Sequence, residues 1–162
     1  MCGNCRDDDD DGLTDFEDPD CCAQPASLNG TTIEILPADH VGGPARFALG
    51  AHLPPAGSAD TSPLVDDVTI QVRAGASPIA CANLGHLYWE GAGKTFRFRP
   101  PGRRFPPNLT SALVRVLPDG TIAVRATGAR AGIDGRAGSE WQVAVRIGAR
   151  CGTGSVRPRG LP

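Results

Sequence analysis

The chain has 162 residues, of which 40% are hydrophobic and 21% charged, and its net charge at pH 7 is −2. This size suits a single hydrophobic core, and no run approaches the roughly 20 consecutive apolar residues of a membrane-spanning helix. The small net charge hides a division, because residues 1–22 hold nine acids against Arg6, whereas residues 23–162 hold nine acids against fifteen bases.

The first motif is an acidic run at residues 7–18. Acidic side chains occupy the first, third, fifth, ninth and twelfth places of a twelve-residue loop, and Gly12 is sixth, which is the ligand spacing of an EF-hand-type calcium loop. The alternative is a solvated acidic tail, but without a metal these charges would repel one another. The sequence therefore predicts a Ca²⁺ site whose ligands are Asp7, Asp9, Asp11, the backbone carbonyl of Leu13, Asp15 and Asp18.

The loop departs from a full EF-hand in its flanks and its last ligand. Place twelve is Asp18 rather than a bidentate Glu, and Pro19 prevents a long following helix. The pattern D-x-D-x-D-G-L-x-D resembles the helix-poor calcium loops of thrombospondin type 3 repeats and dockerins. That resemblance implies that calcium has a structural role rather than a sensor role.

Six cysteines accompany the loop: Cys2, Cys5, Cys21, Cys22, Cys81 and Cys151. An even count beside a calcium loop indicates disulfides, and hence an extracellular or cell-surface protein. Zinc is the alternative, because Cys2 and Cys5 have C-x-x-C spacing, but the adjacent second pair suits tetrahedral ligation poorly. The four N-terminal cysteines allow three pairings, and a bridge between Cys81 and Cys151 is the simplest hypothesis for the remaining two.

Met1 is followed at once by Cys2 and then by charge, not by an apolar stretch. We therefore expect the chain to be a mature or excised segment of a secreted protein.

Short runs of alternating apolar and polar residues dominate the rest of the chain. Period two of this kind predicts antiparallel strands with one solvated face. The expected strands cover residues 31–36, 45–53, 65–73, 95–99, 111–117, 121–127 and 140–148, whereas residues 83–90 are ambiguous.

These strands predict an all-β fold, an antiparallel two-sheet sandwich or jelly-roll-like domain preceded by a disulfide-rich calcium-loop segment. An open barrel is the alternative, because strand order is not visible in the sequence. We expect two units: a Cys-rich acidic segment at residues 1–28 and the β-sandwich at residues 29–162.

Three stretches of the sandwich unit, at residues 66–70, 117–122 and 145–151, resemble a β-domain repeated in large secreted proteins of myxobacteria and related bacteria. The resemblance implies a non-catalytic surface or matrix component.

No recognised catalytic motif surrounds the three histidines, His40, His52 and His86, so we expect no enzyme. His86 lies in an aromatic stretch in which Tyr88 and Trp89 are candidates for a glycan-binding surface.

Alternation also turns several arginines outward. A basic patch for acidic glycan or nucleic acid would draw on Arg97, Arg99, Arg103, Arg104, Arg115, Arg125 and Arg146, and the alternative is an ordinary solvated strand face. For an oxidised, calcium-bearing protein, anionic polysaccharide is the better partner than DNA. Two sequons, at Asn29 and Asn108, predict exposed glycosylation sites in a glycosylating host.

Two functions follow as hypotheses. The first is a non-catalytic extracellular structural protein, stabilised by calcium and disulfides and assembled end to end with copies of itself or similar domains into a fibre, stalk or matrix. The second is a carbohydrate-binding or adhesion module of a larger secreted protein, with anionic or neutral polysaccharide as partner. Neither involves nucleic acid or a membrane span.

Overall fold

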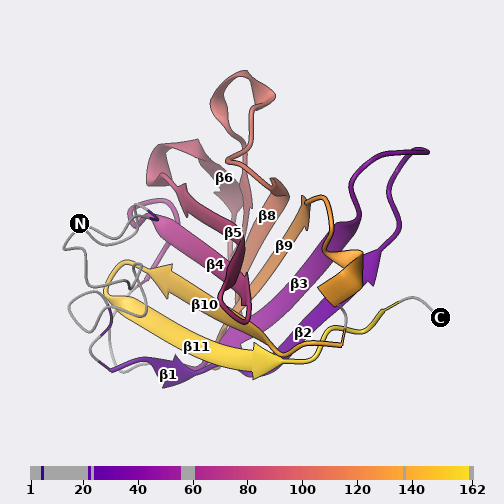
Figure 1. The fold of residues 1–162 in the computed structure, drawn as a ribbon. Coiled ribbons are helices and arrows are strands. Elements are labelled where there is room, and N and C mark those ends of the chain that lie inside the picture. Colours follow the sequence, from indigo (N-terminus) through magenta and orange to yellow (C-terminus); the bar gives the residue numbers. More distant parts are fainter. Residues whose placement is uncertain (1–4, 6–21, 23, 56–60, 137, 161–162) are drawn as a thin grey trace.

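A computed structural model describes residues 5, 22, 24–55, 61–136 and 138–160. Two β-sheets face each other in two layers (Figure 1). Sheet A has the strand order β1-β11-β10-β4-β5. Its strands are β1 (Ala26–Ser27), β4 (Val68–Ala74), β5 (Ser77–Leu84), β10 (Trp141–Ile147) and β11 (Arg150–Val156).

Sheet B has the strand order β2-β3-β9-β8-β7-β6. Its strands are β2 (Asn29–Leu36), β3 (Arg46–Leu53), β6 (Trp89–Ala92), β7 (Thr95–Phe98), β8 (Leu109–Val116) and β9 (Ile122–Ala129). All strand pairs in the two sheets are antiparallel except β1 with β11. The prediction of an all-β, antiparallel two-sheet sandwich is confirmed.

Within the described ranges, three single turns of 3₁₀ helix join the strands: η1 (His86–Tyr88), η2 (Pro101–Arg103) and η3 (Asp134–Arg136). Among the residues that the structure describes, no helix is long and apolar enough to cross a membrane.

The core lies between the sheets and follows the alternation of the sequence. On β10, Trp141, Val143 and Val145 are at most 1% exposed. On β7, Phe96 and Phe98 are buried whereas Arg97 is exposed. Because successive side chains of a strand point to opposite faces, the outward residues of each sheet form a separate surface that the core leaves available for function.

The alternation did not predict β5 or β11. Pro78 and several small residues blur the pattern of β5, and β11 carries Gly152 and Gly154 where other strands carry large apolar residues. A Cβ at position 152 would lie 2.6 Å from Leu53 Cδ1 and 2.8 Å from Leu28 Cδ2. Glycine is therefore needed in β11 because side chains of other segments fill the space beside it.

Two disulfides attach the N-terminal segment to sheet A. Cys5 is bonded to Cys81 on β5, and Cys22 is bonded to Cys151 on β11, with Cα–Cα distances of 5.7 and 6.2 Å. Cys2 and Cys21 lie outside the described residues. Disulfides are thus confirmed for four of the six cysteines, and zinc ligation by Cys5 and Cys22 is replaced by covalent pairing.

The predicted bridge between Cys81 and Cys151 is wrong. Strands β4 and β10 separate β5 from β11, so three strand spacings, roughly 14 Å, lie between their backbones. A disulfide needs Cα atoms within about 7 Å. Pairing confined to the four N-terminal cysteines is also wrong, because Cys5 and Cys22 each reach into the sandwich.

The attachment points lie on the outer face of sheet A. Cys81 is paired in register with Gln71, and Cys151 with Arg146, whose chain neighbours Ile70 and Val145 face the core. The predicted boundary between the two units, at residue 28/29, assigns Ala26–Ser27 to the N-terminal segment. In the structure these two residues form β1, which pairs with β11 of sheet A.

Candidate binding groove on the outer face of the six-stranded sheet

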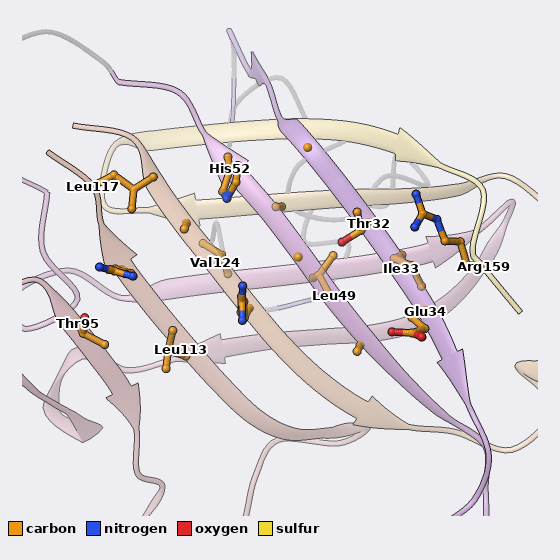
Figure 2. Close-up of a pocket in the computed structure, with 17 residues that line it drawn as sticks. Thr32, Ile33, Glu34, Leu49, His52, Thr95, Leu113, Leu117, Val124 and Arg159 are labelled. Carbon is orange, nitrogen blue, oxygen red and sulfur yellow. The ribbon is translucent and has the colours of Figure 1, made fainter. Parts of the chain in front are cut away.

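An open groove of about 800 Å³ lies on the outer face of sheet B (Figure 2). It crosses β2, β3, β9, β8 and β7, from Thr32 and Glu34 on β2 to Thr95 on β7. We call these outward residues, together with Arg159 beside β2, the sheet B groove. Four strand spacings give it a length of roughly 19 Å across the sheet.

The strand register arranges the groove residues in two parallel rows. One row runs across the sheet through Thr95, Arg115, Ala123 and His52. The neighbouring row runs through Leu113, Arg125, Gly50 and Thr32, and Arg97, the β7 partner of Leu113, continues it outside the groove lining. Each row therefore combines cationic or polar side chains with small residues in the middle of the sheet.

The middle of the groove is lined by residues with small side chains. Ala48 and Gly50 on β3 and Ala123 on β9 are outward positions that carry one carbon or none. A Cβ at Gly50 would lie 2.9 Å from Thr32 Oγ1, so a larger residue there would push into the groove. These small residues leave the strand backbone close to solvent, and taller side chains border them.

Positive charge dominates the groove. Its lining includes Arg115, Arg125 and Arg159 against a single carboxylate, Glu34. Among the described residues, neither Arg115 nor Arg125 forms an ion pair, in contrast to Arg46, whose guanidinium lies 2.7 Å from Asp39. Unneutralised arginines in a concave surface raise the local concentration of anions.

Arg159 enters the groove because the C-terminal segment pairs with the edge of sheet B. Arg159 donates its backbone N–H to Ile33 O at 2.8 Å, and Ile35 donates its N–H to Arg159 O at 2.9 Å. Figure 2 shows the Arg159 and Glu34 side chains at the β2 end of the groove, with His52 on the adjacent strand.

The predicted basic patch is divided by the fold. Arg97, Arg115 and Arg125 share the outer face of sheet B. Arg146 belongs to sheet A, where its Nε donates to Gly148 O at 2.7 Å. Arg99 Nε lies 3.5 Å from Glu90 Oε2 and so has a carboxylate of its own. The remaining two belong to the connection between β7 and β8, where Arg103 ends η2 and Arg104 follows it.

The prediction that Trp89 contributes to a glycan-binding surface is wrong. Trp89 is 5% exposed, its indole N–H donates to Leu84 O at 3.1 Å, and its ring packs edge-on against Phe98 at 5.4 Å. Tyr88 is 41% exposed and borders the same cluster, 6.3 Å from Phe98. Trp89 points inward because it is the inward residue of β6, paired with Phe98 of β7.

The three histidines occupy separate places. His52 lines the sheet B groove, and His40 lies in the loop between β2 and β3. His86 begins η1, where both its backbone N–H and its Nδ1 lie 2.8 Å from Asp67 Oδ1. Partial burial opposes ionisation of Asp67, but the two hydrogen bonds and the charge of His86 outweigh it and lower the pKa of this carboxyl.

The predicted calcium ligands Asp7, Asp9, Asp11, Leu13, Asp15 and Asp18 lie outside the described residues. Within the part of the chain that the structure describes, no three His, Cys, Asp or Glu side chains gather as a metal site would require. The calcium loop stays a prediction.

The two sequons differ in their surroundings. Asn29 is exposed at the start of β2. Asn108 is partly buried, and its side-chain Nδ2 donates to Ile79 O at 3.1 Å. The expectation that both asparagines are exposed is correct for Asn29 and wrong for Asn108, whose amide links the two sheets.

Sequence reasoning missed the groove itself. No functional motif includes Gly50, His52 or Ala123. The sequence indicated only that they occupy outward positions of alternating strands. Comparison of the chain with protein-family models, with curated proteins and with solved structures found no match.

Proposed function

We propose that the chain is a non-catalytic extracellular module that binds polysaccharide in the sheet B groove. The observation that carries this proposal is an open groove about five strands wide, with small residues in its middle and polar or charged residues at its borders. A closed pocket suits a compact small molecule. A shallow groove of roughly 19 Å suits an extended polymer.

The disulfides support an extracellular place of action. Covalent bonds between Cys5 and Cys81 and between Cys22 and Cys151 form and persist in oxidising compartments. Calcium binding at residues 7–18 is part of the proposal, because extracellular calcium is abundant enough to fill a weak site. Isothermal titration of the oxidised protein with Ca²⁺ tests it, and the absence of binding heat at extracellular calcium concentrations would contradict it.

The side chains of the groove support binding without catalysis. Acid–base hydrolysis of a glycosidic bond generally uses two carboxyl groups on either side of the bond. The lining of the groove contains one carboxylate, Glu34, and it lies at the β2 end beside Arg159.

A groove-filling variant tests the proposed function. Ala123→Trp places an indole in the middle of the groove, whereas Gln142→Trp places the same ring on the outer face of sheet A. Both positions face outward, so both variants should fold, as judged by circular dichroism and thermal unfolding. We expect retention on a panel of immobilised polysaccharides to be lost in Ala123→Trp and kept in Gln142→Trp. Equal binding by both variants would place the site elsewhere.

A second function, end-to-end assembly into an extracellular fibre or matrix, is favoured by the positions of the opposite charges. The disulfides fix both ends of the acidic segment to sheet A, and the cationic groove lies on sheet B. An acidic segment of one copy that contacts the groove of the next would make a head-to-tail interface, which propagates as a filament when the rotation between copies does not close into a ring. Electron micrographs with calcium and with chelator test this, and monomers under both conditions would contradict it.

A further inference from the structure

We infer that the ligand of the sheet B groove is an acidic polysaccharide whose sugar units carry carboxylates, held by Arg115 and Arg125. The inference rests on the proposed function and names the chemistry of its ligand. Three observations support it: the absence of a stacking surface among the described lining residues, the placement of the two arginines, and the position of Glu34, the carboxylate of that lining.

The first observation is the lack of aromatic rings in the groove. None of the described residues that line it is Trp, Tyr or Phe. The large aromatic side chains on the strands of sheet B, Phe47, Trp89, Phe96 and Phe98, are all at most 6% exposed and belong to the core. A neutral sugar offers a protein its apolar ring face and its hydroxyls, and this groove has no flat ring to cover such a face. Charge is the chemistry that the groove does offer.

The second observation is the placement of Arg115 and Arg125. In the β8–β9 register Arg125 is opposite Leu113 and Arg115 is opposite Ala123, so the two arginines are diagonal neighbours. Diagonal positions on one face of a sheet are roughly 7–8 Å apart. Each guanidinium presents a planar set of donors that matches a carboxylate bidentately, which gives stronger hydrogen bonds than neutral pairs. Two separate carboxylates along one polymer would satisfy both arginines.

The third observation is the asymmetry of charge along the groove. Thr95 ends the Arg115 row at the β7 side, and Arg97 continues the Arg125 row there, outside the groove lining and opposite Glu90 of β6. Glu34 lies at the opposite end, on β2, with Arg159 beside it. An acidic chain is therefore attracted over β8 and β9, by Arg115 and Arg125, and repelled by Glu34. The small residues Gly50 and Ala123 next to the arginines leave room for the sugar ring that carries the carboxylate.

A nucleic acid is the competing anionic polymer. Single strands bind through a positively charged path combined with aromatic side chains on which bases stack, and the groove has the first without the second. The disulfides also place the protein outside the reducing cytosol. Both points favour the polysaccharide.

The test compares polygalacturonate with its fully methyl-esterified form, which has the same sugar backbone without the charge. Binding of the full, oxidised chain is measured by affinity electrophoresis and by titration calorimetry. The variant Arg115→Ala/Arg125→Ala is matched by Arg104→Ala/Arg157→Ala, which removes the same charge from exposed positions outside the groove. Sulfated dextran and single-stranded DNA serve as further probes.

We expect the wild type and the control double variant to bind polygalacturonate and not its methyl ester, and the groove double variant to bind at least about tenfold more weakly. Glu34→Gln should bind more tightly. Equal binding of the ester would overturn the acidic inference and leave the proposed function standing, whereas no binding to any polysaccharide would overturn both. An equal loss of affinity in the two double variants would show that the binding site is not in the groove. Tighter binding of sulfated dextran or DNA would overturn the choice of a carboxylated polysaccharide.

Discussion

Two atoms of His86 contact the same carboxylate oxygen of Asp67: the backbone nitrogen and the ring Nδ1 each lie 2.8 Å from Asp67 Oδ1. The pair joins the start of η1 to the residue before β4, which are 19 positions apart in sequence. Both side chains are nearly half exposed, at 43% and 48%. The contact therefore lies at the protein surface, where it holds the start of η1 against the start of β4.

This pair predicts a contribution to stability that depends on pH. The pKa of Asp67 is lowered in the folded protein, so its stabilising effect is complete above the unfolded value, about 3.9, and is lost as the pH falls through the lower folded value. Because the pair is exposed, we expect Asp67→Asn to cost less than about 1 kcal/mol at neutral pH. Urea unfolding at a series of pH values measures this. A stability difference that persists undiminished at pH 2 would contradict the role of the charge.

The disulfides Cys5–Cys81 and Cys22–Cys151 should each contribute strongly to the stability of the fold. They close loops with sequence separations of 76 and 129 residues, and removal of a native disulfide typically costs about 2–5 kcal/mol. We expect Cys81→Ser and Cys151→Ser each to lower the unfolding free energy by such an amount. A non-reducing peptide map should join Cys5 to Cys81 and Cys22 to Cys151. Any peptide that links Cys81 to Cys151 would show that the connectivity is different.

The sequons should behave differently from each other in a glycosylating host. Asn29 is exposed, whereas Asn108 Nδ2, the atom to which a glycan attaches, donates to Ile79 O. We expect folded, secreted protein to carry a glycan at Asn29 and none at Asn108. Intact mass should show that Asn29→Gln removes all glycan and that Asn108→Gln leaves it in place. A glycan retained in Asn29→Gln would mean that the contact with Ile79 opens.

Trp89 should affect stability, not specificity. Its burial and its hydrogen bond to Leu84 O make Trp89→Ala a core deletion, with an expected cost of about 3–5 kcal/mol. Tyr88→Ala removes a half-exposed ring with one edge contact, and we expect a cost of about 1 kcal/mol. Denaturant unfolding compares the two. If Trp89→Ala kept full stability and lost glycan binding, the ring would belong to a binding surface after all.

Local alternation was enough to predict most of the strands and which of their residues face the core. Phe96 and Phe98 are inward and Arg97 is outward, as the pattern at residues 95–99 indicated. The pattern failed where packing, not hydrophobicity, selected the residue, as at Gly152 against Leu53. It also failed at Trp89, whose aromatic neighbourhood suggested a surface when the residue is the inward partner of Phe98.

By itself, the sequence determined that the chain is all-β, that its charges are divided between two segments, and that an acidic run has the spacing of a calcium loop. These are properties of neighbouring residues, and the period of two follows from the pleat of a strand. Only the tertiary structure decided that Cys5 meets Cys81 and that Gly50 lies beside Arg125. Such pairs depend on which strands become neighbours, and that choice comes from the packing of the whole core, which no short stretch of sequence contains.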